Sequence, residues 1–198
     1  MPLPHQTCFL TPTALTYLFI FKAPAMIVVY IIIGLIALLL IIATVLPSSY
    51  NIERNTVITC PVDFVKNKIS DLNHYSEWNP WQQSDPKATK TITGTPSQPG
   101  HRYEWNGPKV GNGHLTLTSL DERHVHFKLQ FIKPFASIAN DNWLFEPWHD
   151  TNTKVTWQNN GKFAWPVARL MGPFIMKHMG QQFEKGLNNL KKMCEEGS

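Results

Sequence analysis

One uninterrupted apolar segment constrains this chain more than any other feature of its sequence. Residues 26–46, MIVVYIIIGLIALLLIIATVL, contain no charged side chain over 21 positions. A helix of that length spans roughly 31 Å, which is close to the hydrocarbon thickness of a bilayer. The segment is apolar on every side, whereas a helix on the surface of a globular core normally has a polar face. We therefore predict one transmembrane helix over residues 26–46, with membrane contact through residues 27–46.

The residues before this segment are interpreted as an N-terminal extension, 1–25, with Lys22 as its one charged residue. Met26 stands at the start of the apolar run, which indicates that Met26 is the natural initiator and the extension an upstream mis-start. A cleaved signal peptide fits less well, because the run is long and no small-residue cleavage site follows it. Short amino-terminal anchors often keep their N-terminus inside, which favours a single-pass membrane protein with its domain outside the cytoplasm.

After a minimal linker, 47–49, the remaining residues 50–196 are long enough for one globular domain. Lys22 is the only charged residue before Glu53, so this part carries 17 of the 18 basic residues and all 14 acidic ones. The basic residues are scattered, which is typical of a solvated surface and unlike a nucleic-acid-binding stripe. The three cysteines form no CxxC motif. We expect a monomer with no nucleic-acid partner.

Periodicity predicts an α+β domain. Residues 50–59 alternate and are rich in β-branched side chains, which indicates a strand. Residues 61–72 repeat apolar side chains at helical spacing, and about six strand signals with short connections follow, which favours an antiparallel meander. From Pro166 onward, apolar residues recur every three or four positions in a long amphipathic helix. Its apolar stripe must be buried, and the concave face of a curved sheet is the available partner.

Four stretches in this order resemble the START-like helix-grip superfamily, also called SRPBCC or polyketide cyclase/dehydrase-like. They are ERNTVITCPVDFVKNKISDLNHYSEWNPW, YEWNGPKVGNGHLTLT, WLFEP…TKVTW and LMGPFIMKHMGQQFEKGLNNLKK. The similarity covers nearly all of residues 50–193 and is close to a branch that has an N-terminal membrane helix and no assigned activity. The resemblance implies a START-like domain over residues 50–196, in which a curved antiparallel sheet wraps a long C-terminal helix. It also implies a cavity between sheet and helix, but no particular reaction.

Aromatic and methionine side chains are the candidate lining of that cavity. The strand tryptophans alternate with polar neighbours and so face one side of the sheet. Flat rings of this kind suit a hydrophobic or aromatic ligand, but they would equally fill a closed core. The candidate ligand-binding residues are Tyr103, Trp105, Phe127, Trp143, Trp157, Met171, Phe174, His178 and Met179.

Two more tryptophans lie in the stretch HYSEWNPWQQSDP, which otherwise resembles a polar loop. Trp78 and Trp81 flank a proline there, and large amphipathic rings in a loop are suited to covering apolar volume at a boundary with water. We interpret them as the cavity rim, where they either contact a ligand or close the end of the core.

Candidate catalytic groups are few. His178 lies on the apolar stripe one turn after Phe174, where an imidazole could act as general acid or base. Asp141 shares strand parity with Trp143 and is expected to face inward, where it would need hydrogen-bonding partners. The sequence shows no convergent ligand cluster, so neither a metal site nor a cofactor is predicted.

These observations favour a membrane-anchored binding protein for a hydrophobic small molecule or lipid. One alternative is a polyketide cyclase/dehydrase-like enzyme that uses cavity polar residues such as His178, Asp141 or Tyr103. Another is an interaction module with a filled core. Binding needs only the apolar lining, which is present in the sequence. Catalysis needs a convergent polar constellation, which the sequence does not show, so binding is expected rather than catalysis.

Overall fold

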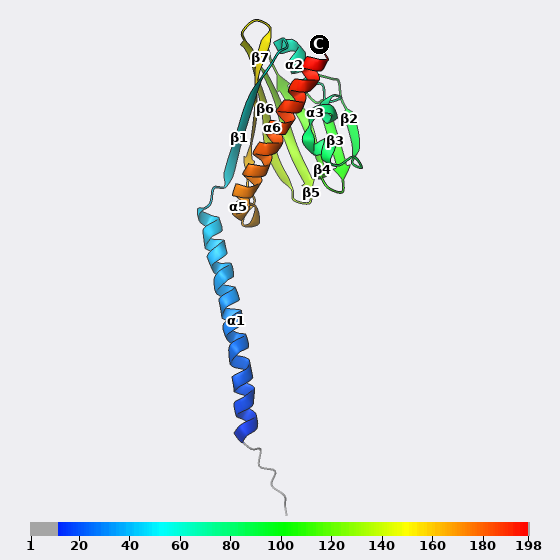
Figure 1. Ribbon diagram of the computed structural model, residues 1–198. Coiled ribbons are helices and arrows are strands. Elements are labelled where there is room, and N and C mark those ends of the chain that lie inside the picture. The colour runs from blue at the N-terminus through cyan, green and yellow to red at the C-terminus, as the bar shows by residue number, and fades with distance from the viewer. Residues whose placement is uncertain (1–11, 198) are drawn as a thin grey trace, which may run out of the picture. The chain divides into compact units, whose positions relative to one another are not determined.

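The structure is a computed structural model, and it describes residues 12–197. The chain divides after Leu46 into two units, and each is described by itself. The first unit is a single helix, α1 (Pro12–Val45) (Figure 1). Its segment Met26–Val45 is long and apolar enough to cross a membrane, a property that a membrane anchor shares with a signal sequence. Met26 lies inside α1 and not at its start, while residues 1–11 of the expected extension lie outside the described residues. The assignment of Met26 as initiator stays a prediction.

The second unit begins at Pro47 and contains the remaining elements. In chain order these are β1 (Ser49–Ile58), α2 (Val62–Ser70), α3 (Tyr75–Trp78), α4 (Pro80–Ser84), β2 (Thr89–Thr93), β3 (Arg102–Gly107), β4 (Gly111–Leu120), β5 (His124–Lys133), β6 (Ser137–Trp148), β7 (Asn152–Lys162), α5 (Val167–Leu170) and α6 (Gly172–Glu196). Met171 separates the short α5 from the long C-terminal helix α6, which has Pro173 in its first turn, where the missing N–H of proline is tolerated.

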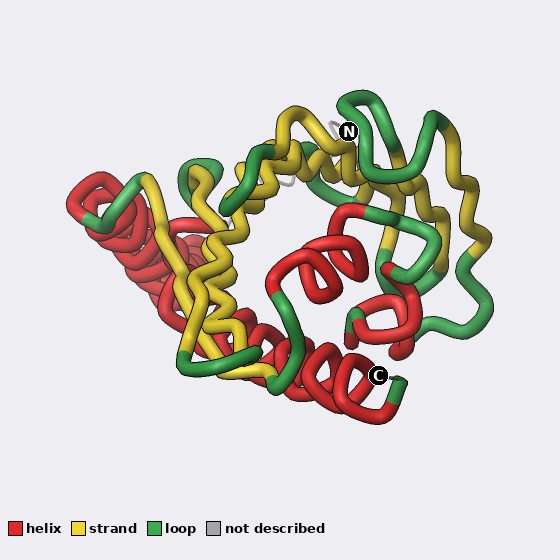
Figure 2. The backbone as a smooth tube through the Cα atoms, turned by 90° about the horizontal axis from the view of Figure 1, so that it is seen from above, coloured by secondary structure: helices red, strands yellow, loops and turns green. Residues whose placement is uncertain are grey.

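Seven strands form one antiparallel sheet in the order β1-β7-β6-β5-β4-β3-β2. The strands from β2 to β7 are a meander, and β1 completes the sheet by pairing with β7 from Ser49↔Lys162 to Ile58↔Thr153. Figure 2 shows the strands curving round the helices of this unit. The predicted arrangement, a curved antiparallel sheet around a long C-terminal helix, is confirmed.

Stacked aromatic rings join α6 to the sheet. Trp143 of β6 and Trp157 of β7 are direct cross-strand partners, and their rings stack with centroids 4.5 Å apart. Phe183 of α6 stacks on the Trp157 ring with centroids 3.9 Å apart. Trp78 packs edge-on against both tryptophans at 5.5 and 5.6 Å. Gly186 allows the helix to come this close, because a Cβ there would lie 2.8 Å from the Trp157 ring.

A buried carboxylate accepts hydrogen bonds from the indole groups of this stack. Asp141 of β6 is 5% exposed and accepts hydrogen bonds from Trp143 Nε1 at 3.0 Å, Trp157 Nε1 at 2.8 Å and Asn159 Nδ2 at 2.9 Å. Burial raises the pKa of Asp141 to about 6, although the three hydrogen bonds favour the ionised form. The inward orientation expected from strand parity is what the structure has, and the partners are uncharged donors.

This environment makes the stability of the domain depend on pH. Because the pKa of Asp141 is higher in the folded state than its ordinary value of 3.8, the folded protein binds the proton more tightly than the unfolded chain does. The contribution to stability is therefore complete below about pH 4 and is lost as the pH rises past about 6, a difference on the order of 3 kcal/mol.

We expect Asp141→Asn to remove this dependence between pH 4 and 7. The amide also places an N–H against Trp143 Nε1, and an unsatisfied buried donor costs about 1–3 kcal/mol at low pH. Urea unfolding of the full chain in a mild nonionic detergent, followed by tryptophan fluorescence, measures both effects. Asp150→Asn is the matched control, because Asp150 is exposed in a turn at φ 47° that asparagine tolerates. Equal pH slopes in the wild type and Asp141→Asn would contradict the prediction.

Candidate functional site

A groove opens at the end of the sheet where β6 and β7 separate. The two strands pair from Trp148↔Asn152 to Ala139↔Gly161 and no further. Beyond that point β6 stays with β5, through the pair Phe131↔Ser137, while β7 stays with β1, through Ser49↔Lys162. The divergence of the two strand pairs leaves an opening with a wall on each side.

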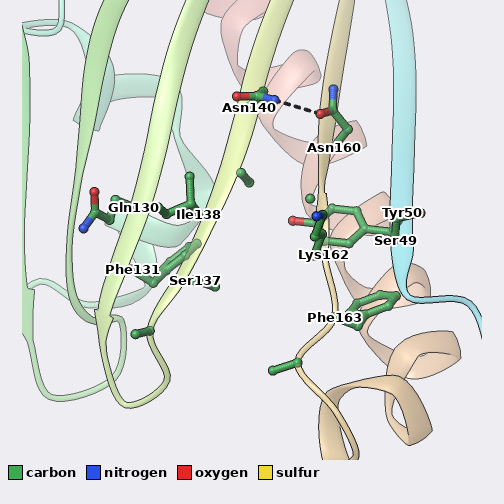
Figure 3. Close-up of a pocket in the computed structure, with 14 residues that line it drawn as sticks. Ser49, Tyr50, Gln130, Phe131, Ser137, Ile138, Asn140, Asn160, Lys162 and Phe163 are labelled. Atoms are coloured by element: carbon green, nitrogen blue, oxygen red, sulfur yellow. Dashed lines mark hydrogen bonds between the residues drawn. The ribbon is translucent and has the colours of Figure 1, made fainter. Parts of the chain in front are cut away.

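The groove has a volume of about 850 Å³. Figure 3 shows Phe131, Ser137 and Ile138 on one wall and Tyr50, Lys162 and Phe163 on the other. The lining also includes small residues, which leave space between the walls, and the amide side chains of Gln130, Asn140 and Asn160. The complete lining is Ser49, Tyr50, Gln130, Phe131, Ala136, Ser137, Ile138, Ala139, Asn140, Asn160, Gly161, Lys162, Phe163 and Ala164.

Tyr50 connects the groove with the buried carboxylate. Its ring lies over Gly161, where a Cβ would come within 2.7 Å of the hydroxyl oxygen, and it packs on Phe163 with centroids 4.9 Å apart. The Tyr50 hydroxyl donates to Asn159 Oδ1 at 3.1 Å, and the same amide donates to Asp141. A hydrogen-bonded chain therefore runs from the groove wall through Asn159 to the core.

The ionisable groups of the groove do not form an acid–base pair. Among the 14 described lining residues, Tyr50 and Lys162 are the ionisable ones. Burial, and then the charge of Asp141, raises the pKa of Tyr50 to about 12, so its hydroxyl stays protonated and acts as a donor. Asn140 Nδ2 donates to Asn160 Oδ1 at 3.1 Å between two paired residues of β6 and β7, next to the last pair before the strands separate. The groove thus offers apolar walls, amide groups and one exposed cation, which suits holding a molecule with an apolar body.

The aromatic strand residues expected to contact a ligand lie in the packed core. Each is at most 6% exposed, and none of them lines the groove. Their rings pack on other aromatic rings: Tyr103 on Tyr75 at 4.9 Å and on Trp105 at 6.5 Å, Trp105 also on Phe131 at 5.7 Å, and Trp143 on Trp157 at 4.5 Å. The residues concerned are Tyr103, Trp105, Phe127, Trp143 and Trp157.

The expected helix and loop residues are divided between core and surface. Met171 and Phe174 are exposed at the start of α6, His178 is also exposed, and Met179 packs partly against the core. In the loop, Trp78 is fully buried, whereas Trp81 is partly buried and packs edge-on against Phe183 at 5.8 Å. These tryptophans cover the aromatic stack from the side of α3 and α4.

The two candidate catalytic residues are not brought together. His178 is exposed on α6, whereas Asp141 is buried and its hydrogen-bond partners are Trp143, Trp157 and Asn159. Within residues 12–197, no group of three or more His, Cys, Asp or Glu side chains has the arrangement of a metal site.

The groove residues were not among those predicted from the sequence to bind a ligand. One signal was present: the inward positions at the ends of β6 and β7 hold Ala139 and Gly161, where the central positions hold tryptophans. A change from large to small residues along paired strands indicates space, but its use requires the strand register, which the sequence alone does not provide.

Comparison with solved structures shows the same fold in proteins of low sequence identity. The aromatase/cyclase Zhui from Streptomyces sp. R1128 matches with a TM-score of 0.55 and 14% identity over 74% of this chain and 94% of that one. The protein TTHA0849 from Thermus thermophilus matches with a TM-score of 0.57 and 16% identity over 75% and 99%. A protein from Thermobifida fusca gives 0.53 and 20% over 73% and 92%.

No curated protein matches this chain in sequence. The family model described as "Polyketide cyclase / dehydrase and lipid transport" matches residues 50–195, which is most of the chain and nearly all of the second unit. The superfamily predicted from the four sequence stretches is thereby confirmed, and the chain belongs to the polyketide cyclase/dehydrase and lipid transport family.

Proposed function

We propose that this protein is a membrane-tethered binding protein that holds a hydrophobic molecule, such as a lipid chain or an aromatic compound, in the groove between β6 and β7. The observation that carries the proposal is the groove itself, an opening of about 850 Å³ with Tyr50, Phe131, Ile138 and Phe163 on its walls. Ligand sites in proteins have volumes of about 300–1,000 Å³ and mostly apolar linings with a few polar groups. Membership of a family that includes lipid transport supports the same ligand class.

The groove is a better candidate than the interior between sheet and helix. The stack of Trp143, Trp157 and Phe183, with centroids 4.5 and 3.9 Å apart, occupies the space in which a ligand would lie against α6. Displacing these rings would expose aromatic surface and leave the Asp141 carboxylate without its indole donors. Opening the interior would therefore cost more than filling a groove that is already present.

The polar groups of the groove favour a ligand with one polar end. Lys162 is exposed, and the amides of Gln130, Asn140 and Asn160 lie along the same opening. A carboxylate, phosphate or phenol at one end of the molecule would bind these groups, while its apolar part lies between the aromatic walls. The protonated Tyr50 hydroxyl is already bonded to Asn159 and supports the wall.

Filling the groove tests this proposal. Ser137 is exposed and lines the groove, so Ser137→Phe places a ring in the opening without disturbing the core. We expect the full chain, purified from its host membranes into amphipol, to retain a hydrophobic compound detectable by native mass spectrometry and solvent extraction. Ser137→Phe should lower its occupancy at least about tenfold, the effect of losing about 1.4 kcal/mol of binding free energy.

Thr91→Phe is the matched control, since it adds the same ring at an exposed position of β2, which does not line the groove. This variant should retain the compound at the wild-type level. An identical set of bound compounds in the wild type and in Ser137→Phe, or no bound compound together with no response to added fatty acids, phospholipids, quinones and polyaromatics, would refute the groove as a binding site.

The tether is tested separately. The uncharged helix segment Met26–Val45 is expected to keep the full chain in host membranes through high-salt and alkaline carbonate washes, because its apolar surface can be satisfied only by lipid. Amino-terminal sequencing of the retained protein distinguishes an anchor from a signal sequence. Release by carbonate of a protein that begins near Ser48 would show that the helix had been cleaved.

A further inference from the structure

Large apolar side chains are exposed round the mouth of the groove. They lie on two segments, residues 129–138 round the turn between β5 and β6 and residues 161–178 from the end of β7 into α6, and we call them the apolar rim. Phe135 is 80% exposed, Phe174 70% and Val167 65%. The rim consists of Ile132, Phe135, Ile138, Trp165, Val167 and Phe174, with Met171 beside them.

The two segments flank the groove and lie at one end of the domain. Ile138 forms part of one wall and Phe163 part of the other (Figure 3). Ala164 also lines the groove, and Trp165 follows it in the chain. Phe163 also packs against the first turn of α6, where a Cβ on Gly172 would lie 3.2 Å from its ring. The start of β1 is at the same place, because Phe163 N donates to Ser48 O at 2.9 Å.

The charge of these segments is of one sign. Residues 129–138 and 161–178 contain four basic residues, Lys133, Lys162, Arg169 and Lys177, and no acidic residue. The three lysines are exposed. Lysine is depleted in protein–protein interfaces, whereas exposed lysines on the same segments as exposed aromatic and aliphatic side chains match an apolar layer covered by anionic headgroups. The partner that fits this chemistry is a bilayer containing anionic lipid.

The chain connectivity supplies a second reason. Only residues 46–48 lie between the end of α1 at Val45 and the start of β1 at Ser49. Such a connection reaches roughly 10–14 Å. If α1 crosses the bilayer, as the proposed function requires, then the end of the domain that carries Ser49, the groove and the apolar rim is held beside the bilayer surface.

We infer that the apolar rim is a membrane-docking surface, which inserts its side chains among anionic lipid headgroups and opens the groove directly to the bilayer. The inference rests on the proposed tether and specifies the source of the ligand, a lipid or lipid-soluble molecule that enters the groove without crossing water. The three lysines then bind headgroup phosphates, and Lys162, which also lines the groove, is placed to contact the polar end of the entering molecule.

The test places a fluorescent probe at the rim of the full chain. In a Cys8→Ser background the remaining cysteines, Cys60 and Cys194, are buried, so a single NBD label can be attached at Ala136→Cys. The matched label is at Thr151→Cys, which is exposed in the turn between β6 and β7, at the opposite end of those strands. Each protein is reconstituted in nanodiscs of phosphatidylcholine and phosphatidylglycerol, some of which carry nitroxide groups on their acyl chains.

We expect the label at position 136 to be blue-shifted and quenched by the acyl-chain nitroxide, and the label at 151 to be neither. Charge reversal of Lys133, Lys162 and Lys177 to Glu should reduce the quenching at position 136. The partitioning of the rim into the bilayer, calculated from that quenching, should fall at least about fivefold, because a single lysine near an anionic surface already contributes about a factor of five. Reversal of three exposed cations outside both segments, Arg123, Lys128 and Lys192, should leave the quenching unchanged.

The failures of the two proposals are distinguishable. Incorporation of the chain in the nanodisc with equal, unquenched labels at 136 and 151 would overturn the docking surface and leave the tether intact. A chain that does not enter nanodiscs would overturn both. A blue shift at 136 without nitroxide quenching would place the label either in the groove, which Ala136 lines, or under a second protein chain, and would also overturn docking to lipid.

Discussion

The stack of Trp143, Trp157 and Phe183 is the contact on which the rest of this domain depends. It joins two neighbouring strands to α6, and edge-on packing by Trp78 and Trp81 attaches the short helices α3 and α4 to the same point. Aromatic pairs of this geometry contribute about 0.5–1.5 kcal/mol each beyond the burial of their area. The arrangement also fixes the distance between helix and sheet, because Gly186 leaves room for the Trp157 ring and for no additional side chain.

Filling the centre with rings has two consequences. The indole N–H groups of Trp143 and Trp157 must find acceptors inside the protein, and Asp141 supplies the acceptor oxygens. Burial disfavours the ionised form of this carboxyl group, and the hydrogen bonds offset part of that cost. The second consequence is that free volume is displaced from the middle of the sheet to its end, where β6 and β7 have small residues and no longer pair. Core and groove remain coupled, since Asn159 bonds both to Asp141 and to Tyr50.

Much of the fold could be predicted from the sequence, because alternation and helical spacing are local properties. The strand at residues 50–59 and the inward orientation of Asp141 follow from two-residue alternation, and the amphipathic C-terminal helix follows from three- and four-residue spacing. The meander follows from the short connections between strands. The groove could not be predicted in this way, since it depends on where the ladder between β6 and β7 stops. Parity also placed Tyr103 and Trp105 on the inner face correctly but gave no information on whether that face encloses a cavity.

The start of α6 shows a different limit of the same reasoning. The apolar stripe predicted for this helix included Phe174 and His178 together with Phe183 and Leu187. Phe183 follows Phe174 by nine positions and His178 by five, which at about 100° per residue puts the two pairs on different sides of the helix. In the structure Phe183, Leu187 and Leu190 are buried, and on the same side of α6 the earlier Met176 and Met179 pack against the core. Phe174 and His178 are exposed on another side of the helix. An exposed Phe or Ile forgoes burial worth about 1.5–3 kcal/mol, a cost that the domain cannot recover within its own fold. Several such side chains on one basic end therefore indicate a surface whose apolar partner lies outside the globular unit, and the apolar helix three residues away brings that partner within reach.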